Sequence, residues 1–231
     1  MKVALVTGAG TGIGLATCAL LAQAGFQILL VGRRESLLQA AAAPLGPSVA
    51  RVHTADVGDY DQAQACVDRA IEAFGRLDVV VNNAGHVASM LIGAVDESRA
   101  RRLFDVNAIG PTAIINRAWP HMVAQKSGRI INVSSMATVD PFPGLGVYAA
   151  TKAAVNLLAR AAHNEGRRRG ILAFAVAPGA VETAMLRSIV DERALPPART
   201  LQPDQVARIV VECATGARDH QSGEVITVPS P

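Results

Sequence analysis

Aromatic residues and cysteines are scarce in this sequence, and each shortage excludes a class of protein. Aromatic residues make up 3% of the 231 residues although half are hydrophobic. The core must therefore consist of Ala, Val, Leu and Ile, a mixture that suits helices packed on buried strands. The three cysteines, Cys18, Cys66 and Cys213, are far apart, and no pair has disulfide or zinc spacing. We therefore expect a reducing compartment.

Long hydrophobic runs are also absent. No apolar stretch approaches transmembrane length, and Met1–Val6 enters a strand-like segment without the architecture of a signal peptide. We expect a cytoplasmic protein with no membrane contact. The net charge is +3, and Arg167–Arg169 is the only dense basic patch. Basic residues at a helix end offset the helix dipole, so the patch does not predict nucleic-acid binding.

Metal-ligand spacing is missing as well. The histidines are His53, His86, His121, His163 and His220. They show no ligand spacing among themselves or with the cysteines, so we expect no metal. His86 is either a residue near a bound nicotinamide or an ordinary loop histidine.

Short aliphatic runs alternate with longer segments of helical period. Strands are predicted at Val3–Thr7, Gln27–Val31, Val49–Thr54, Val79–Asn82, Arg129–Ser134, Leu172–Val176 and Val225–Val228. Helices are predicted at Gly12–Ala24, Tyr60–Phe74, Glu97–Ala124, Tyr148–Glu165 and Pro203–Cys213. Wholly apolar strands that alternate with helices indicate a parallel sheet covered on both faces. We predict a single α/β domain over residues 1–231, a Rossmann-like doubly wound sheet of about seven strands.

A glycine-rich loop follows the first predicted strand. Gly8, Gly12 and Gly14 precede a helix, where backbone N–H groups and the helix N-terminus favour a pyrophosphate. The spacing departs from the common G-x-G-x-x-G pattern. The alternative is a strand-to-helix turn with no ligand, but its position after the first strand favours a dinucleotide site.

The end of the second strand bears on the choice of dinucleotide. Sites for NAD(H) usually carry an acidic residue about 20 residues after the glycine loop, to hold the ribose 2′-hydroxyl. Gly32 occupies that place here, and Arg33 follows it. A guanidinium can bind a 2′-phosphate through paired hydrogen bonds. We therefore favour NADP(H) over NAD(H), with solvated arginines as the alternative.

Polar residues also follow the third and fourth strands. Asp56 either accepts a hydrogen bond from adenine or caps the next turn. Asn82–Gly85 offers two amides and two small residues where the chain would pass the cofactor. By itself that second segment is only a turn.

Tyr148 and Lys152 lie four residues apart in a helical segment and so share one face. A neighbouring ammonium favours the phenolate, so we expect Lys152 to lower the pKa of Tyr148 from about 10 and make it a proton shuttle. Such pairs also occur on ordinary surface helices. The fifth strand adds Ser134 and Ser135, where a hydroxyl could polarise a substrate carbonyl.

Together these residues resemble the short-chain dehydrogenase/reductases, in particular members similar to 3-oxoacyl-ACP reductases. The resemblance covers nearly the whole chain and is strongest up to about Thr183. It rests on motifs in the family's order: Thr7–Gly14, Asp56-Val57, Asn82–Gly85, Asn107, Ser135, Tyr148-x-x-x-Lys152, Pro178-Gly179 and Thr183.

The resemblance implies a role for each matching residue. Tyr148 would exchange a proton with the substrate oxygen, Lys152 would lower its pKa and bind the nicotinamide ribose, and Ser135 would orient the substrate. Asn107 would hold a water that links Lys152 to solvent. The chemistry would be hydride transfer that interconverts a carbonyl and an alcohol. The expected cofactor-binding residues are Gly8, Gly12, Ile13, Gly14, Arg33, Asp56, Val57, Asn83, Ala84, Gly85, Tyr148, Lys152, Pro178, Gly179, Val181 and Thr183.

Two features depart from the family's pattern. Phe174 stands where an asparagine is common, and the Thr227–Pro231 end lacks the usual Asp-Gly-Gly. We expect a homodimer or homotetramer by analogy. The segment from Ala184 to Gln202 should form a substrate lid, whose apolar residues close on substrate or pack as an amphipathic helix.

Several functions remain compatible with the residues. The substrate classes are 3-oxoacyl thioesters, simple ketones, sugars and steroids. A non-catalytic dinucleotide sensor would not need Asn107, Ser135, Tyr148 and Lys152 together. An NAD-preferring alcohol dehydrogenase is the closer alternative. A lyase, dehydratase or epimerase of the same fold usually needs a larger C-terminal substrate domain.

Overall fold

The alternating apolar runs build one seven-stranded sheet in the computed structural model, which describes residues 1–231. The strands are β1 Lys2–Thr7, β2 Phe26–Gly32, β3 Ala50–Thr54, β4 Val79–Asn82, β5 Gly128–Val133, β6 Ile171–Pro178 and β7 Val225–Val228. Every neighbouring pair is parallel, in the order β3-β2-β1-β4-β5-β6-β7. The predicted doubly wound α/β sheet is confirmed.

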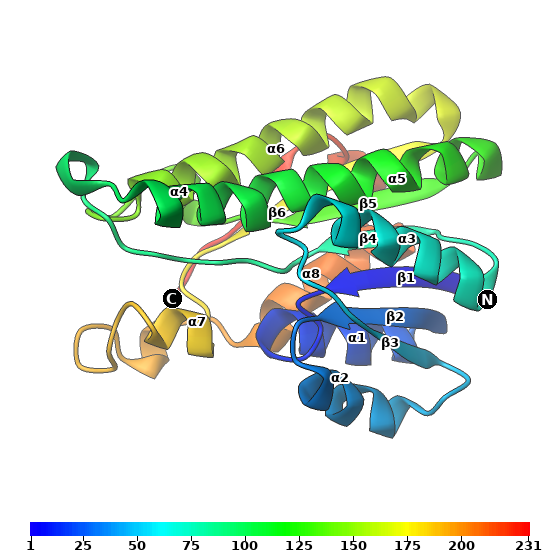
Figure 1. Ribbon diagram of the computed structural model, residues 1–231, viewed down its shortest axis with the longest axis horizontal. Helices are drawn as coiled ribbons and strands as arrows, with labels where there is room; N and C mark the ends of the chain where they lie inside the picture. The colour runs from blue at the N-terminus through cyan, green and yellow to red at the C-terminus, as the bar shows by residue number, and fades with distance from the viewer.

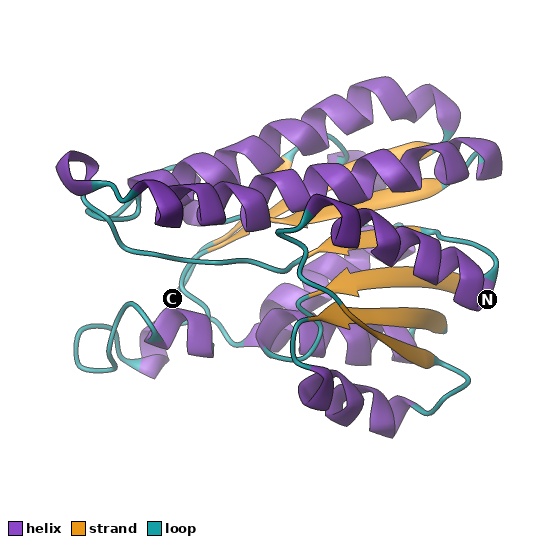
Figure 2. Cartoon of the chain, in the orientation of Figure 1, coloured by secondary structure: helices purple, strands orange, loops and turns teal.

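Two layers of helices enclose the sheet (Figure 2). One layer contains α1 Gly12–Gln23, α2 Glu35–Ala42 and α8 Pro203–Thr215. The other contains α3 Tyr60–Phe74, α4 Glu97–Phe104, α5 Gly110–Gln125 and α6 Gly146–Gly166. The short helix α7 Ala184–Arg187 lies outside both layers, at the edge toward which β1 points (Figure 1).

Successive residues of each strand face opposite sides of the sheet and enter two separate cores. In β1, Ala4 and Val6 pack with the layer of α1, whereas Val3 and Leu5 pack with the layer of α3. Phe174, the departure noted in the sequence, is fully buried in the core beside α1 and α8. Burial on both sides explains why the strands are apolar throughout.

The strand order reverses between β1 and β4, which are neighbours although two strands separate them in sequence. Ligands of open α/β sheets bind outside the carboxyl ends of the strands at such a reversal. The segments after β1 and β4, Thr7–Gly14 and Asn82–Gly85, therefore meet where a ligand is expected.

Some element boundaries differ from the prediction. The helix expected over Glu97–Ala124 is divided by a π-helical segment, Asp105–Ile109. Pro111 has no N–H and cannot make the α-helical bond to the Asn107 carbonyl, which favours the irregularity. Helix α2 was not predicted, because its buried apolar pattern consists only of Leu38 and Ala41.

Candidate functional site

The glycine loop between β1 and α1 has a shape that strongly favours glycine. Gly8 and Gly12 have φ values of +65° and +55°, in the left-handed region that side chains disfavour. A Cβ on Gly14 would overlap the carbonyl oxygen of Gly8. Thr11, the N-cap of α1, makes no side-chain capping bond, and the first turn has no acidic residue. The helix N-terminus is therefore suited to an anion.

The Thr7 hydroxyl joins the ends of β1 and β4. It accepts hydrogen bonds from the backbone N–H groups of Asn83 at 3.0 Å and Ala84 at 2.9 Å. The Asn83 side chain in turn donates to the Thr7 carbonyl at 2.9 Å. Thr7 therefore holds together two of the predicted cofactor-binding segments, although in the sequence it is only the first residue of the Thr7–Gly14 motif.

Residues after β6 reach the same loop. The Thr183 methyl group would lie 3.1 Å from a Cβ on Gly12, and the Thr183 hydroxyl caps α7 through Leu186 N–H at 3.2 Å. Val181 pairs with Leu201 as an isolated bridge. Gly179 is covered by Ser230, which leaves no room for a Cβ.

Asp56 is already paired within the chain. Its carboxylate accepts hydrogen bonds from Arg102 Nη2 at 2.6 and 2.8 Å and from the Gly58 N–H at 2.9 Å. Burial opposes ionisation, but the Gly58 bond and the charges of Arg102 and Arg33 hold the pKa of Asp56 below its usual value. The turn-capping alternative is therefore observed, and Arg102 is a partner that was not predicted.

Arg33 lies just beyond β2 and is exposed. It makes no ion pair or side-chain hydrogen bond within the chain, so its guanidinium is free for a ligand. A Cβ on Gly32 would lie 3.4 Å from Leu38, an ordinary contact. The fold would therefore accommodate a side chain at position 32, the place where NAD(H) sites usually carry an acidic residue.

Tyr148, Lys152 and Ser135 converge beside the end of β5. The ammonium of Lys152 lies 5.8 Å from the centre of the Tyr148 ring and donates to the Val133 carbonyl at 2.8 Å. Ser135 follows the strand by two residues, and its hydroxyl oxygen accepts from Ala137 N–H at 3.1 Å. That bond uses a lone pair of the hydroxyl, so the Ser135 proton can be donated to the Tyr148 side chain or to a substrate oxygen.

The expected pKa change at Tyr148 was wrong in direction. Burial raises the pKa of Tyr148 to about 12, although the Ser135 side chain lowers it in part. Burial also lowers the pKa of Lys152, to about 8. Both effects arise because removal from water disfavours a charged form. The chain alone therefore holds a neutral phenol beside an ammonium at neutral pH.

Asn107 lies in the π-helical segment and is buried. Its Nδ2 donates to the His86 carbonyl at 2.8 Å and to Thr151 Oγ1 at 3.0 Å, while Oδ1 accepts from His86 N–H at 2.8 Å. Three of its four side-chain hydrogen-bonding positions are thus used. One lone pair on Oδ1 remains.

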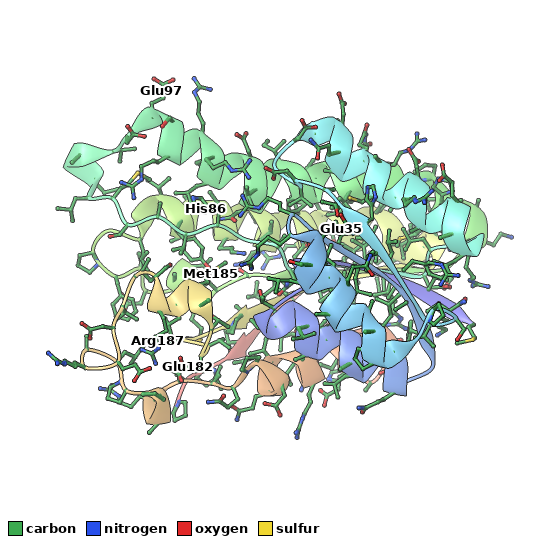
Figure 3. The ribbon with its side chains drawn as sticks, turned by 60° about the horizontal axis from the view of Figure 1, so that its bottom comes forward. Glu35, His86, Glu97, Glu182, Met185 and Arg187 are labelled. Atoms are coloured by element: carbon green, nitrogen blue, oxygen red, sulfur yellow. The ribbon has the colours of Figure 1, made fainter.

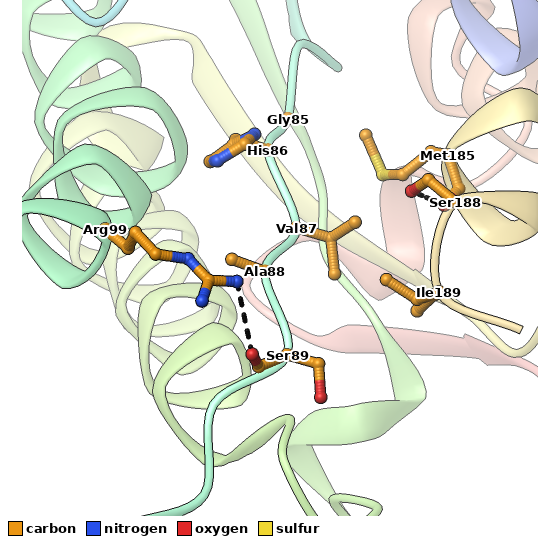
Figure 4. Close-up of a pocket in the computed structure, with 9 residues that line it drawn as sticks. All are labelled: Gly85, His86, Val87, Ala88, Ser89, Arg99, Met185, Ser188 and Ile189. Atoms are coloured by element: carbon orange, nitrogen blue, oxygen red, sulfur yellow. Dashed lines mark hydrogen bonds between the residues drawn. The ribbon is translucent and has the colours of Figure 1, made fainter. Parts of the chain in front are cut away.

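A cleft of about 600 Å³ opens between the segment after β4 and α7 (Figure 4). Met185, Ser188 and Ile189 line one side, while Arg99 and His86 lie across the extended segment from them (Figure 4). The full lining is Gly85, His86, Val87, Ala88, Ser89, Arg99, Met185, Ser188 and Ile189. Burial lowers the pKa of His86, and the charges of Arg102, Arg33 and Arg99 lower it further.

The cleft lies beside Lys152 and Asn107 at Gly85, and beside Tyr148 at Ala88. A Cβ on Gly85 would lie 3.6 Å from both Lys152 Nζ and Asn107 Oδ1. Ala88 belongs to a small apolar cluster against which Tyr148 packs. His86 is therefore part of the cleft wall rather than an isolated loop histidine.

Only part of the predicted lid is helical. Met185 and Ile189 face the cleft, whereas Arg187 is ion-paired with Glu182 and donates to the Leu195 carbonyl at 2.8 Å. Figure 3 shows Glu182, Met185 and Arg187 grouped at α7. Arg187 therefore ties the segment together, and it is not a free surface cation.

No three His, Cys, Asp or Glu side chains gather as a metal site. All three cysteines are buried and unpaired. Burial raises the pKa of Cys66 and Cys213 to about 12. None of the helices combines the length and apolar character that a membrane span needs.

Comparison with known proteins identifies the family. A family model described as short chain dehydrogenase matches residues 2–194. The chain belongs to the short-chain dehydrogenase family. It is therefore an oxidoreductase of a family whose members bind a nicotinamide dinucleotide. The parallel sheet described above is the fold of this family.

Individual relatives are similar over nearly the whole chain. An uncharacterized oxidoreductase of Staphylococcus aureus (strain USA300) is 31% identical over 99% of this chain and 97% of its own. A solved short chain dehydrogenase/reductase family protein is 33% identical with a TM-score of 0.89, over 99% of this chain and 95% of its own. A crystal structure of a protein provisionally assigned as a betaketoacyl-ACP reductase is 32% identical with a TM-score of 0.88, over 99% and 96%.

Proposed function

We propose that this short-chain dehydrogenase interconverts a carbonyl and an alcohol with NADP(H), using Tyr148 as its general acid and base. The observation that carries the proposal is the buried ammonium of Lys152 beside the Tyr148 ring, with Ser135 at the end of the neighbouring strand. A buried ammonium is costly, and such groups are usually retained for function.

The residues present fit a nicotinamide dinucleotide. The loop of Gly8, Gly12 and Gly14 has no side chain in the space before α1, and the uncapped first turn offers N–H groups for a pyrophosphate. The remaining proposed contacts lie in α1, after β3, after β4, in α6 and at the end of β6 or just after it. They are Ile13, Asp56, Val57, Asn83, Ala84, Gly85, Pro178, Gly179 and Val181, together with Tyr148 and Lys152.

Arg33 supports NADP(H) rather than NAD(H). Its guanidinium has no partner in the chain, and Gly32 leaves the neighbouring position without a carboxylate. A 2′-phosphate would meet a free cation just beyond β2, and β2 itself ends without an acidic residue.

In this proposal the protein handles the proton while the cofactor handles the electrons. The nicotinamide, when bound, exchanges two electrons and a hydrogen with the substrate carbon. Tyr148 gives its hydroxyl proton to the substrate oxygen during reduction, and Ser135 donates a hydrogen bond to the same oxygen. Lys152 stabilises the phenolate that remains. The high pKa of Tyr148 keeps the acid form in place, which suits reduction.

Asn107 supports proton return to Tyr148 through Lys152. Its Oδ1 keeps one free lone pair, and Pro111 deprives its carbonyl of the usual helical donor. The free lone pair on Oδ1 is available to a water, and a Cβ on Gly85 would lie 3.6 Å from both Oδ1 and Lys152 Nζ. The side chain also fixes His86 and so shapes the cleft.

We also propose that α7 and the following residues to Gln202 act as the substrate lid, and that the chain forms homodimers or homotetramers. Met185 and Ile189 support the lid, because they face the cleft although their side chains are 39% and 38% exposed.

The exposed apolar residues Phe104, Ile109 and Leu157, on the layer of α4, α5 and α6, support assembly into homo-oligomers. Buried unpaired thiols support a reducing, cytoplasmic location.

The decisive experiment follows oxidation of NADPH and NADH by the absorbance of the reduced nicotinamide. Small ketones, diketones and 3-oxoacyl thioesters form the substrate panel, and binding titrations accompany the rates. Turnover with NADPH supports the proposal and begins to define the substrate. Faster turnover with NADH would overturn the cofactor assignment. Tight binding without turnover on a broad panel would favour a dinucleotide sensor.

A further inference from the structure

Three consecutive residues at the end of β5 bind α6 through hydrogen bonds. Ser134, just beyond the strand, donates its hydroxyl proton to the main-chain carbonyl of Lys152 at 3.2 Å. Val133, the last residue of the strand, accepts a hydrogen bond from the Lys152 ammonium at 2.8 Å. Asn132 donates its side-chain amide to the main-chain carbonyl of Val155 at 3.0 Å. Lys152 is therefore bound to the strand through both its main chain and its side chain.

The Ser134 bond is not needed for α6 to form. A carbonyl inside an α-helix already accepts a hydrogen bond from the N–H four residues further on. The Ser134 hydroxyl is an additional donor to the Lys152 carbonyl, and Ser134, Asn132 and Lys152 are all buried. A buried polar group is costly unless it is paired. These polar contacts therefore fix where α6 lies on the sheet.

The next strand supports the same contact. Asn82, the last residue of β4, donates from Nδ2 to Asn132 Oδ1 at 2.9 Å. This bond orients the Asn132 amide so that its Nδ2 faces the Val155 carbonyl. Asn82 also precedes Asn83, whose N–H is bound by the Thr7 hydroxyl. The strand that leads into a proposed cofactor segment thus takes part in holding α6.

These contacts connect the residues to which we assign the chemistry. Ser135 directly follows Ser134, and Tyr148 lies one helical turn before Lys152 in α6. A shift of α6 along β5 would therefore move Tyr148 relative to the Ser135 hydroxyl. It would also move the Lys152 ammonium away from the Val133 carbonyl.

We propose that Ser134 is a positioning residue, whose bond to the Lys152 main chain sets the register of α6 on β5. It thereby places the Lys152 ammonium at the Val133 carbonyl and Tyr148 beside Ser135. The catalytic consequence rests on the proposed function, whereas the placement of Lys152 can be tested without substrate.

The first test is an NMR titration of Lys152. Lys2, Lys126 and Lys152 are the only lysines in the chain, so protein labelled with ¹³C at lysine Cε gives few signals, and Lys152→Met assigns the signal of Lys152. Burial lowers the pKa of Lys152 to about 8, and no charged side chain from the elements around α6 contributes. Tyr148 is the titratable side chain beside the ammonium. The Val133 carbonyl stabilises the charged form, so its displacement in Ser134→Ala should lower the pKa by about 0.5.

Matched variants separate the Ser134 bond from general damage. Ser134→Thr keeps the hydroxyl and should keep the wild-type pKa of Lys152. Thr112→Val removes a similar bond, from the Thr112 hydroxyl to the Ala108 carbonyl at 2.8 Å beside α5, and should also leave that pKa unchanged. Ser134→Cys keeps the size and donates only weakly, so it replaces Ser134→Ala if that variant fails to fold. An unchanged or raised Lys152 pKa in Ser134→Ala overturns the inference.

The second test measures turnover with NADPH and the best substrate of the panel. In Ser134→Ala, kcat should fall about tenfold, because small displacements of reacting groups are costly. The KM for substrate and the dissociation constant of NADPH should change little, and Ser134→Thr should restore kcat. Weaker binding of both ligands with unchanged kcat contradicts a positioning role. A wild type without turnover contradicts the proposed function, whereas the Lys152 titration still decides the inference about Ser134.

Discussion

The ammonium group of Lys152 lies 5.8 Å from the centre of the Tyr148 ring, one helical turn away in α6. Lys152 is 4% exposed, and its ammonium makes one hydrogen bond within the chain, to the Val133 carbonyl. A charge held this far from water is positioned at a cost in stability. Its benefit must lie in what it does for Tyr148 and for bound ligands.

Replacing Tyr148 with Phe should abolish turnover and leave cofactor binding intact. Loss of a general acid typically costs about 10²–10⁴-fold in rate. Rates and NADPH titrations on the variant provide the measurement. Tyr60→Phe is the matched control, since Tyr60 is the only other tyrosine and lies at the exposed start of α3. Full activity in the Tyr148 variant would remove that residue from the mechanism.

Arg33→Ala should weaken NADPH binding about tenfold, or 1.4 kcal/mol, because a charged hydrogen-bond donor to the 2′-phosphate is lost. NADH binding should change little. Arg160→Ala, which removes an exposed positive charge from α6, serves as the control for net charge. Unchanged NADPH affinity in the Arg33 variant would exclude this arginine from the phosphate site.

Lys152→Met should inactivate the enzyme and stabilise the cofactor-free protein by about 1–2 kcal/mol at neutral pH, because a buried ammonium is removed. Burial lowers the pKa of Lys152 to about 8, against about 10.4 when unfolded. Between these values the unfolded chain binds more protons, so wild-type stability rises with pH. The advantage of the variant should shrink over that range in denaturant melts. A variant less stable than wild type would contradict this account.

The rate of reduction should be level below about pH 8 and fall above it. Lys152 loses its charge near pH 8, whereas Tyr148, with a pKa of about 12, stays protonated. The limb above pH 8 therefore reports Lys152. Profiles of kcat/KM with NADPH test this expectation, and a rate that keeps rising to pH 10 would argue against it.

The sheet could be predicted because its strands are buried on both faces and so are apolar throughout. The glycine loop and the Tyr148-x-x-x-Lys152 spacing could also be predicted, because each is a short pattern that is local in the sequence. The pairing of Asp56 with Arg102 joins residues 46 apart, and neither carries a local signal for the other. The direction of the Tyr148 pKa change depends on burial, which spacing alone does not reveal.

The π-helical segment at Asp105–Ile109 sets the relative phase of the two helices that flank it. An α-helix turns by about 100° per residue. The wider π-helical turn takes up the one extra residue. In a regular α-helix the same insertion would rotate α4 against α5 by that angle. Either Leu103 or the face of Ile114 and Ala118 would then swing away from its apolar cluster. The π-helical segment therefore keeps α4 and α5 in register with their separate apolar clusters although it contains one extra residue.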